Sequence, residues 1–207
     1  MLDALTRVMA SRDGATADHA RRVQRYALAL AQEVCTNDDA LVDAVHTAAL
    51  LHDIGKLAIP DRVLYKPGPL TREEYEQVKH HAVIGAEILG GIEYDGPLAA
   101  IVRHHHENWD GSGYPDGLHG EAIPLGARLL AIVDCYDALT SERPYRHGLS
   151  HDRALAMIVE RRGIMYDPSL TDSFARIVPR LRASAPQRQE DCVPPYAFRL
   201  RSATRLL

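Results

Sequence analysis

The sequence predicts an all-α fold of about seven helices in one compact domain. Apolar residues recur every three to four positions through most of the chain, no segment alternates as a strand would, and glycine and proline gather between the periodic segments. The 207 residues are enough for one domain with a sizeable core. We therefore expect a helical domain over residues 1–183 and a loosely structured tail over 184–207, where proline and arginine are frequent.

Local signals define the individual helices and the long loop between them. Thr16 is the expected N-cap of the first helix, Gly55 the expected end of the second, and Thr71 with Glu74 a capping box that opens the third. Four glycines and a proline within residues 107–120 indicate a long structured loop, which in a compact domain is usually functional. The expected helices span 16–34, 39–54, 71–89, 96–105, 124–141, 150–162 and 169–182.

The composition excludes several classes of function. A net charge of −4 offers no basic surface for a nucleic-acid polymer. No run approaches 18 apolar residues and the N-terminus has no signal-peptide pattern, so we expect a cytoplasmic protein without membrane contact. Three cysteines in no paired spacing favour a reducing compartment. Histidine stands out, with eleven residues.

Ionisable residues fall on the apolar faces of three expected helices. His19, His52 and Asp134 each occupy a place in the apolar series of its helix. Burying such groups costs several kcal/mol each unless they find partners. A hydrogen-bonded core residue explains any one of them, whereas a divalent metal explains all three. Consecutive histidines at 104–106, of which two can face one cavity, and the pair at 80–81 add further imidazoles.

The donor types indicate which metals the site would hold. Imidazole and carboxylate without thiolate suit borderline first-row ions rather than a closed structural zinc site. We expect iron or manganese, with nickel, cobalt, zinc and magnesium as alternatives. Because the candidates exceed what one ion needs, the sequence favours two divalent ions bridged by a carboxylate, an arrangement suited to phosphoryl displacement.

Five segments carry these residues in a fixed order: "HARRV" (19–23), "LLHDIGKLAIPDRVLYKPGPLTREEY" (50–75), "HAVIGAEIL" (81–89), "HHENWDGSGYP" (105–115) and "VDCYDALTSERPYR" (133–146). Together they resemble the HD-GYP phosphodiesterases, a branch of the HD superfamily of metal-dependent phosphohydrolases. The resemblance covers roughly residues 1–180. It implies an HD-superfamily helical domain with a long GYP loop, and hydrolysis of cyclic di-GMP to pGpG, GMP or both by a hydroxide that bridges two metals.

The resemblance also implies a role for each motif residue. Asp53 would be the bridging ligand and, with Lys56, a catalytic residue. The implied metal ligands are His19, His52, Asp53 and Asp134 for one ion and His81, His105 and His106 for the other. The implied substrate contacts are Lys56, Arg143, Arg146, Gly113, Tyr114 and Pro115. Glu107, Asp110 and Asp137 would hold the ligands in place. Some family members bind a third metal through a glutamate four residues before the first histidine, where this chain has Ala15. The local sequence instead resembles a family variant with an aspartate six residues before that histidine, which is Asp13 here. We expect two ions.

Alternative readings stay open at this point. Lys56 could instead complement a helix C-terminus, and the two arginines could form a solvated basic turn. The enzyme could hydrolyse another cyclic dinucleotide or nucleotide, or the chain could be a catalytically weak cyclic-di-GMP sensor or interaction module. Cyclic di-GMP is the expected small-molecule partner, with a homodimer or other signalling proteins as further candidates. About fifteen residues precede His19, which fits a stand-alone enzyme or an excised piece.

Overall fold

The periodic apolar segments fold into helices throughout the described part of the chain, residues 2–12, 14–142 and 147–183 of a computed structural model. No strand forms within these residues, which confirms the all-α prediction. The α-helices are α1 (Leu2–Arg12), α2 (Gly14–Val34), α3 (Asp39–Leu51), α4 (Asp61–Leu64), α5 (Arg72–Gly90), α6 (Leu98–His104), α7 (Leu125–Thr140), α8 (His151–Glu160) and α9 (Pro168–Ala183). Two 3-10 helices, η1 (Ile54–Ala58) and η2 (Gly120–Ala122), lie between them.

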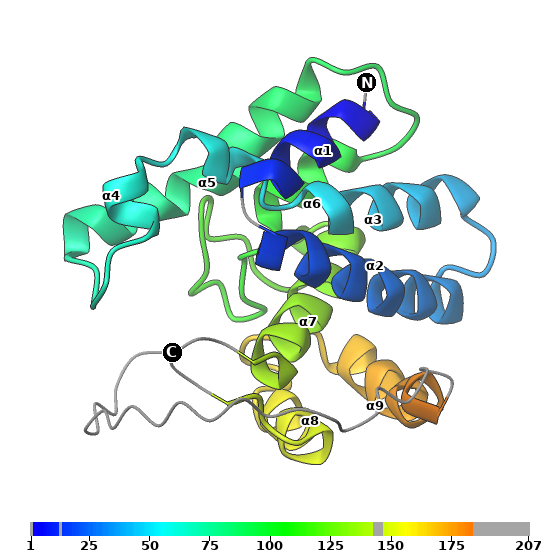
Figure 1. Cartoon of the computed structure of the whole chain (residues 1–207). Helices are drawn as coiled ribbons and strands as arrows, with labels where there is room; N and C mark the ends of the chain where they lie inside the picture. The colour runs from blue at the N-terminus through cyan, green and yellow to red at the C-terminus, as the bar shows by residue number, and fades with distance from the viewer. Residues whose placement is uncertain (1, 13, 143–146, 184–207) are drawn as a thin grey trace.

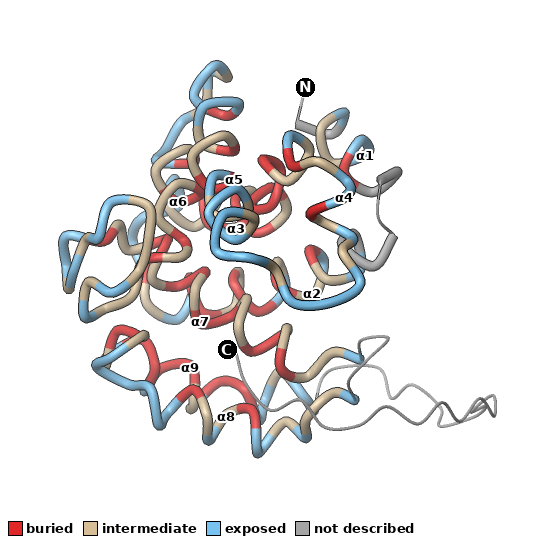
Figure 2. Tube along the Cα trace, turned by 90° about the vertical axis from the view of Figure 1, so that its left-hand side faces the viewer, coloured by how far each residue is buried: buried red, intermediate tan, exposed pale blue. Residues whose placement is uncertain are grey.

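Helix α7 lies at the centre of the arrangement. It packs against α2, α3 and α6 on one side and against α8 and α9 on the other (Figure 1). Nine of its 16 residues are buried, and these buried residues recur from one end of the helix to the other, with half-buried residues between them (Figure 2). A helix that is apolar on most sides has to be covered on most sides. Side chains on α7 can therefore contact several elements that are distant in sequence.

Most local predictions agree with the structure, and four need correction. The capping box forms as expected: Thr71 Oγ1 accepts from Glu74 N at 3.2 Å, and Thr71 N donates to Glu74 Oε2 at 2.7 Å. Thr16 is not an N-cap, because α2 already begins at Gly14. Helix α1 was not predicted, although its buried Met9 packs into the core. The connector before α5 also contains the short helix α4.

The fourth correction concerns Gly55, which does not end the second helix. Helix α3 ends at Leu51, and Gly55 lies inside η1. A Cβ on Gly55 would lie 1.9 Å from the carbonyl oxygen of His81. The position therefore needs glycine for close packing of η1 against α5, and not for a helix-ending conformation.

Some predictions concern residues outside the described part of the chain. Residues 184–207, the expected tail, lie outside the described residues, so the boundary after 183 stays a prediction. Asp13, Arg143 and Arg146 also lie outside them. Among the described helices, none combines the length and the apolar character needed to cross a bilayer.

Candidate metal centre

The end of α3 carries the first two residues of the site. Helix α3 buries Ala48 and Leu51 and then ends, so that His52 and Asp53 follow directly on its core side. Only 2% of His52 and 6% of Asp53 is exposed. Ionisable groups at this depth need partners, because removal from water is costly.

Three buried histidines are oriented in the same way. Nδ1 of His52, His81 and His105 lies 3.0, 2.6 and 2.6 Å, respectively, from the carbonyl oxygen three residues earlier. A carbonyl oxygen only accepts, so Nδ1 carries the proton and Nε2 keeps its lone pair. An imidazole fixed through one nitrogen and free at the other is the usual arrangement of a metal-binding histidine.

His19 on α2 is oriented by a carboxylate. Its Nδ1 lies 2.7 Å from Asp137 Oδ2, and Asp137 also accepts from Arg22 Nε at 2.7 Å. Asp137 is 1% exposed and lies on α7. Nε2 of His19 points to Asp134 Oδ1, 3.1 Å away and one turn earlier on α7. The contact of Arg22 with Asp137 was not predicted, although Arg22 belongs to the "HARRV" segment.

Asp53 lies between two groups of donors. Its Oδ2 is 3.6 Å from His52 Nε2, and its Oδ1 is 3.6 Å from His81 Nε2. Within each of two triads, the ligand atoms lie within 4.8 Å of one another. The first triad is His19, His52 and Asp53, and the second triad is His81, His105 and His106. Asp134 Oδ1, 3.8 Å from His52 Nε2, adds a carboxylate to the first triad.

The second triad is neutral at physiological pH. Burial lowers the pKa of His81 and holds the pKa of His105 well below its usual range. Burial also lowers the pKa of His106 to about 4, against the opposing charge of Asp134. Neutral imidazoles are the form that binds metal.

Opposing charges determine protonation in the first triad. Burial lowers the pKa of His19, but hydrogen bonds and charges from Asp134 and Asp137 outweigh it and raise that pKa to about 9. Burial raises the pKa of Asp53, but the charges of Lys56 and the neighbouring histidines hold it well below its usual range. The carboxylates are therefore ionised. Nitrogen and carboxylate donors in this number fit divalent first-row ions, while the identity of the metal stays a prediction.

The GYP loop closes over His106. A Cβ on Gly113 would lie 2.3 Å from Asn108 N and 2.6 Å from His106 O, so the loop folds back on itself only with glycine here. Tyr114 N donates to His106 O at 3.2 Å, and the two rings lie 4.9 Å apart between centroids. Pro115 follows through a cis peptide bond.

Two carboxylates hold this loop through hydrogen bonds, Glu107 from a buried position and Asp110 from an exposed one. Glu107 Oε1 accepts from Asp116 N at 2.8 Å and Gly117 N at 3.1 Å. Asp110 Oδ1 accepts from the backbone nitrogen and the hydroxyl of Ser112 at 2.9 and 2.6 Å. Both carboxylates therefore hold the loop rather than belong to a triad.

The remaining candidates divide between the site and its surroundings. Lys56 Nζ lies 2.7 Å from Asp53 Oδ2, and 37% of its side chain is exposed, so it contacts both the site and solvent. His104 turns away, with Nε2 2.9 Å from Asp116 Oδ2. His80 is exposed, with Nδ1 2.8 Å from the carbonyl oxygen of Glu76.

Comparison with known proteins shows which family this chain resembles in sequence. The HD domain family model matches residues 3–170. A probable cyclic di-GMP phosphodiesterase of Vibrio cholerae is 42% identical over 186 residues, which cover 83% of this chain and 42% of that protein. The cyclic di-GMP phosphodiesterase response regulator RpfG of Xanthomonas campestris is 44% identical over 177 residues, 84% of this chain and 47% of that one.

Other relatives broaden the comparison. The 3'3'-cGAMP-specific phosphodiesterase 3 of Vibrio cholerae is 36% identical over 168 residues, 81% of this chain and 36% of that one. The chain thus spans less than half the length of these curated relatives. The fold matches that of an HDG"Y"P protein from Bdellovibrio bacteriovorus with a TM-score of 0.63 at 20% identity, over 79% of this chain and 52% of that one. The chain therefore belongs to the HD-domain family, and its resemblance to the HD-GYP branch is confirmed.

Proposed function

We propose that the chain is a metal-dependent phosphodiesterase that hydrolyses cyclic di-GMP to pGpG, GMP or both. The observation that carries this proposal is the position of Asp53, with one carboxylate oxygen toward each triad. Two adjacent donor groups that share a carboxylate fit a two-metal hydrolase better than a single structural ion. Relatives named as cyclic di-GMP phosphodiesterases, at 42% and 44% identity, support this substrate.

The proposed ligands are the two triads and Asp134. His19, His52, Asp53 and Asp134 would hold one ion, and His81, His105 and His106 the other, with Asp53 shared. Bound divalent ions would supply water activation and charge neutralisation at the phosphate. Iron or manganese is the proposed metal, since the proposed donors are imidazoles and carboxylates without a thiolate.

The protein's own groups bind and orient the substrate. Lys56 contacts Asp53 while part of its side chain faces solvent, so it is placed to attract a phosphodiester anion. The proposed contacts of Arg143 and Arg146 suit phosphate oxygens or the guanine edge, which a guanidinium recognises with two parallel hydrogen bonds. The loop at Gly113, Tyr114 and Pro115 would form a wall over His106 and restrict water there.

A second candidate function is hydrolysis of another cyclic dinucleotide. A relative at 36% identity is named 3'3'-cGAMP-specific, so closely similar domains carry different substrate names. The two functions share all proposed metal ligands and differ in recognition of one base.

Turnover with defined substrates tests both functions. Metal-free protein is refilled with Mn(II) or anaerobic Fe(II) and given cyclic di-GMP, 3'3'-cGAMP or cyclic di-AMP, and the products are separated by chromatography. We expect fastest turnover of cyclic di-GMP. Faster turnover of 3'3'-cGAMP supports the second function, and binding without hydrolysis under every metal supports a sensor.

Ligand variants test the metal assignment independently of the substrate. His52→Ala or Asp53→Ala should abolish turnover and lower the metal content, because each removes a shared or buried donor. The exposed neighbour His80→Ala is the matched control and should retain both. Near-normal turnover in either ligand variant would contradict the proposed centre, and three firmly bound ions per chain would contradict the count of two.

A further inference from the structure

Backbone hydrogen bonds join the loop after His105 and His106 to residues 164–165. Trp109 N donates to Met165 O at 3.0 Å, and Asp110 N donates to Ile164 O at 2.9 Å. These two donors lie three and four residues after His106. The place of the 164–165 backbone therefore determines where this loop runs.

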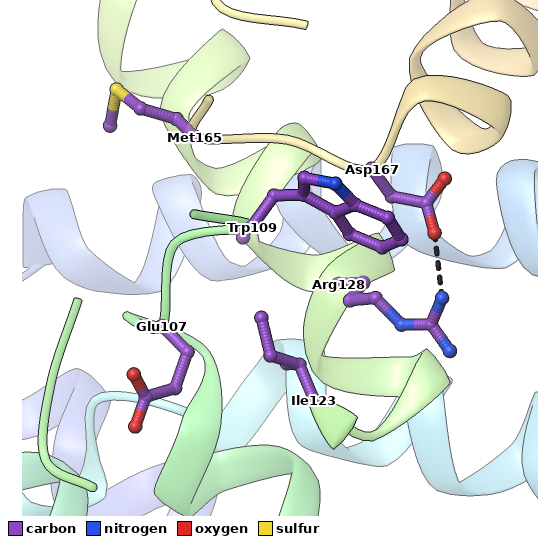
Figure 3. A pocket seen from close by; sticks show the side chains of 7 residues that line it. Glu107, Trp109, Ile123, Arg128, Met165 and Asp167 are labelled. Carbon is purple, nitrogen blue, oxygen red and sulfur yellow. Dashed lines mark hydrogen bonds and ion pairs between the residues drawn. The ribbon is translucent and has the colours of Figure 1, made fainter. Parts of the chain in front are cut away.

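One guanidinium connects this region to α7. Arg128 Nη1 donates to Asp167 Oδ2 at 2.6 Å, and the guanidinium lies 5.8 Å from the centre of the Trp109 ring (Figure 3). The other oxygen of Asp167 accepts from Ser169 N at 2.8 Å and Leu170 N at 3.2 Å, at the start of α9. Arg128 thus contacts the loop and the start of α9 from its place on α7.

This arrangement is not the one that stability alone would favour. Nε of Arg128 is buried and finds no acceptor among the described residues. The narrow pocket around it, lined by Glu107, Trp109, Ile123 and Asp167, is too tight to admit a water molecule (Figure 3). An unpartnered buried donor costs free energy, and an apolar side chain of similar volume would avoid that cost. The free-energy cost of burying Arg128 Nε without an acceptor indicates that Arg128 has a role other than stabilising the fold.

We propose that Arg128, acting through Asp167 and Trp109, is a positioning residue for the second triad. Arg128 lies six residues before Asp134 on the same helix, so it fixes the loop after His105 and His106 relative to the helix that completes the first triad. The inference rests on the proposed two-metal centre. The site needs both donor groups held at a constant separation, which a buried, directional arginine–carboxylate contact provides.

Metal stoichiometry and affinity test this role without any turnover measurement. Arg128→Leu removes the guanidinium and keeps much of the volume, while Asp167→Asn keeps an oxygen to cap α9. Bound Mn(II) or Co(II) is counted by elemental analysis, and dissociation constants are measured by chelator competition. We expect the wild type to bind two ions, and each variant to hold one ion normally and the other about tenfold more weakly, the size of effect seen when an outer-shell partner is lost.

Two controls separate positioning from general loosening. Arg162→Leu breaks the exposed Arg162–Asp172 pair, joined at 2.9 and 2.7 Å in the same part of the chain, and should leave both ions bound. In a His81→Ala background, which removes one ligand of the second triad and should prevent firm binding there, Arg128→Leu should have no further effect on metal content. Circular dichroism confirms that each variant is folded at the assay temperature.

Clear outcomes would overturn the inference. Two ions at wild-type affinity in Arg128→Leu, or equal weakening of both, would show that Arg128 does not position the second triad. If Arg128→Leu does not fold, Asp167→Asn decides by the same criteria. A wild-type protein that binds fewer than two ions would overturn the proposed metal centre itself, together with this inference.

Discussion

Two motif glycines are required for space rather than for backbone conformation. Gly55 and Gly113 have no positive φ, yet a Cβ on either would lie within 2.3 Å of a backbone atom. The first lets η1 contact α5 at His81, and the second lets the GYP loop contact His106. In both cases the glycine hydrogen allows a metal-ligand candidate and a neighbouring segment to approach closely.

Replacement of Gly55 tests this requirement. Gly55→Ala should lower the free energy of unfolding by about 3 kcal/mol, because the new Cβ meets a carbonyl oxygen that belongs to a helix and cannot easily move. Gly90→Ala is the matched control: nothing lies within 4 Å of its Cβ position, and we expect no loss or a gain of up to about 1 kcal/mol. Denaturant unfolding measures both, and equal stability of the two variants would contradict the close-contact argument.

Asp137 and His19 give a second prediction at the scale of residues. Asp137→Ala removes the acceptor at His19 Nδ1, so the ring loses its orientation and Arg22 loses its partner. The affinity of the first triad for Mn(II) should fall by about 10- to 100-fold, measured by chelator competition. Asp95→Ala, an exposed carboxylate, should leave the affinity unchanged. Unchanged affinity in Asp137→Ala would contradict an orienting role.

At the scale of elements, α5 shows how a local signal at the start of a helix helps to position a proposed metal ligand, His81, further along it. Its start is set by the Thr71–Glu74 capping box, and its body then places His81 two and a half turns later against η1. His80, one position earlier, is exposed because neighbours on a helix differ by about 100° in direction. The start of the helix and its packing together determine which of the two histidines faces the site.

Loss of the capping box gives a prediction for this element. Thr71→Ala should lower the free energy of unfolding by about 1 kcal/mol, because Glu74 N loses its acceptor. The exposed neighbour Arg72→Ala lies outside the box and should change stability by less than about 0.5 kcal/mol. Both values come from denaturant unfolding, and a Thr71→Ala value no larger than that of the control would contradict the role of the cap.

At the scale of the whole molecule, the site gathers groups from α2, α5 and α7 and from the segments that follow α3 and α6. Neutral buried histidines in the second triad make the metal-free protein sensitive to acid. Their pKa values lie below the unfolded value near 6.5, so the unfolded chain binds more protons than the folded one below that pH. The pKa of His19 is raised to about 9, so His19 contributes stability at low pH, and that contribution is lost as the pH rises from 6.5 toward 9.

The stability of chelator-treated protein should therefore have a maximum near pH 6.5. It should fall as the pH drops from 6.5 toward 4, where the unfolded histidines gain protons first, and the contribution of His19 should be lost as the pH rises toward 9. The melting midpoint measured from pH 4 to 9 tests this. His106→Gln should flatten the acid limb, and a midpoint that stays constant between pH 6.5 and 5 would contradict the argument.

The sequence by itself determined the helical class, the start of α5 and the family of motifs, because periodicity, caps and motif spacing are local properties. Helix α1 was not predicted, although Leu5 and Met9 have helical spacing. The prediction for Gly55 was wrong, because the atom that excludes a side chain at this position belongs to another helix.

Only the tertiary structure decided how the candidate residues meet. Asp53 lies between two triads, and His104 turns to Asp116. Arg22 and Arg128 hold the surroundings of the site. All of these arrangements depend on contacts between segments that are far apart in the chain. The physical reason is that Coulomb attraction and hydrogen bonding act over a few ångströms in space, and sequence separation does not report that distance.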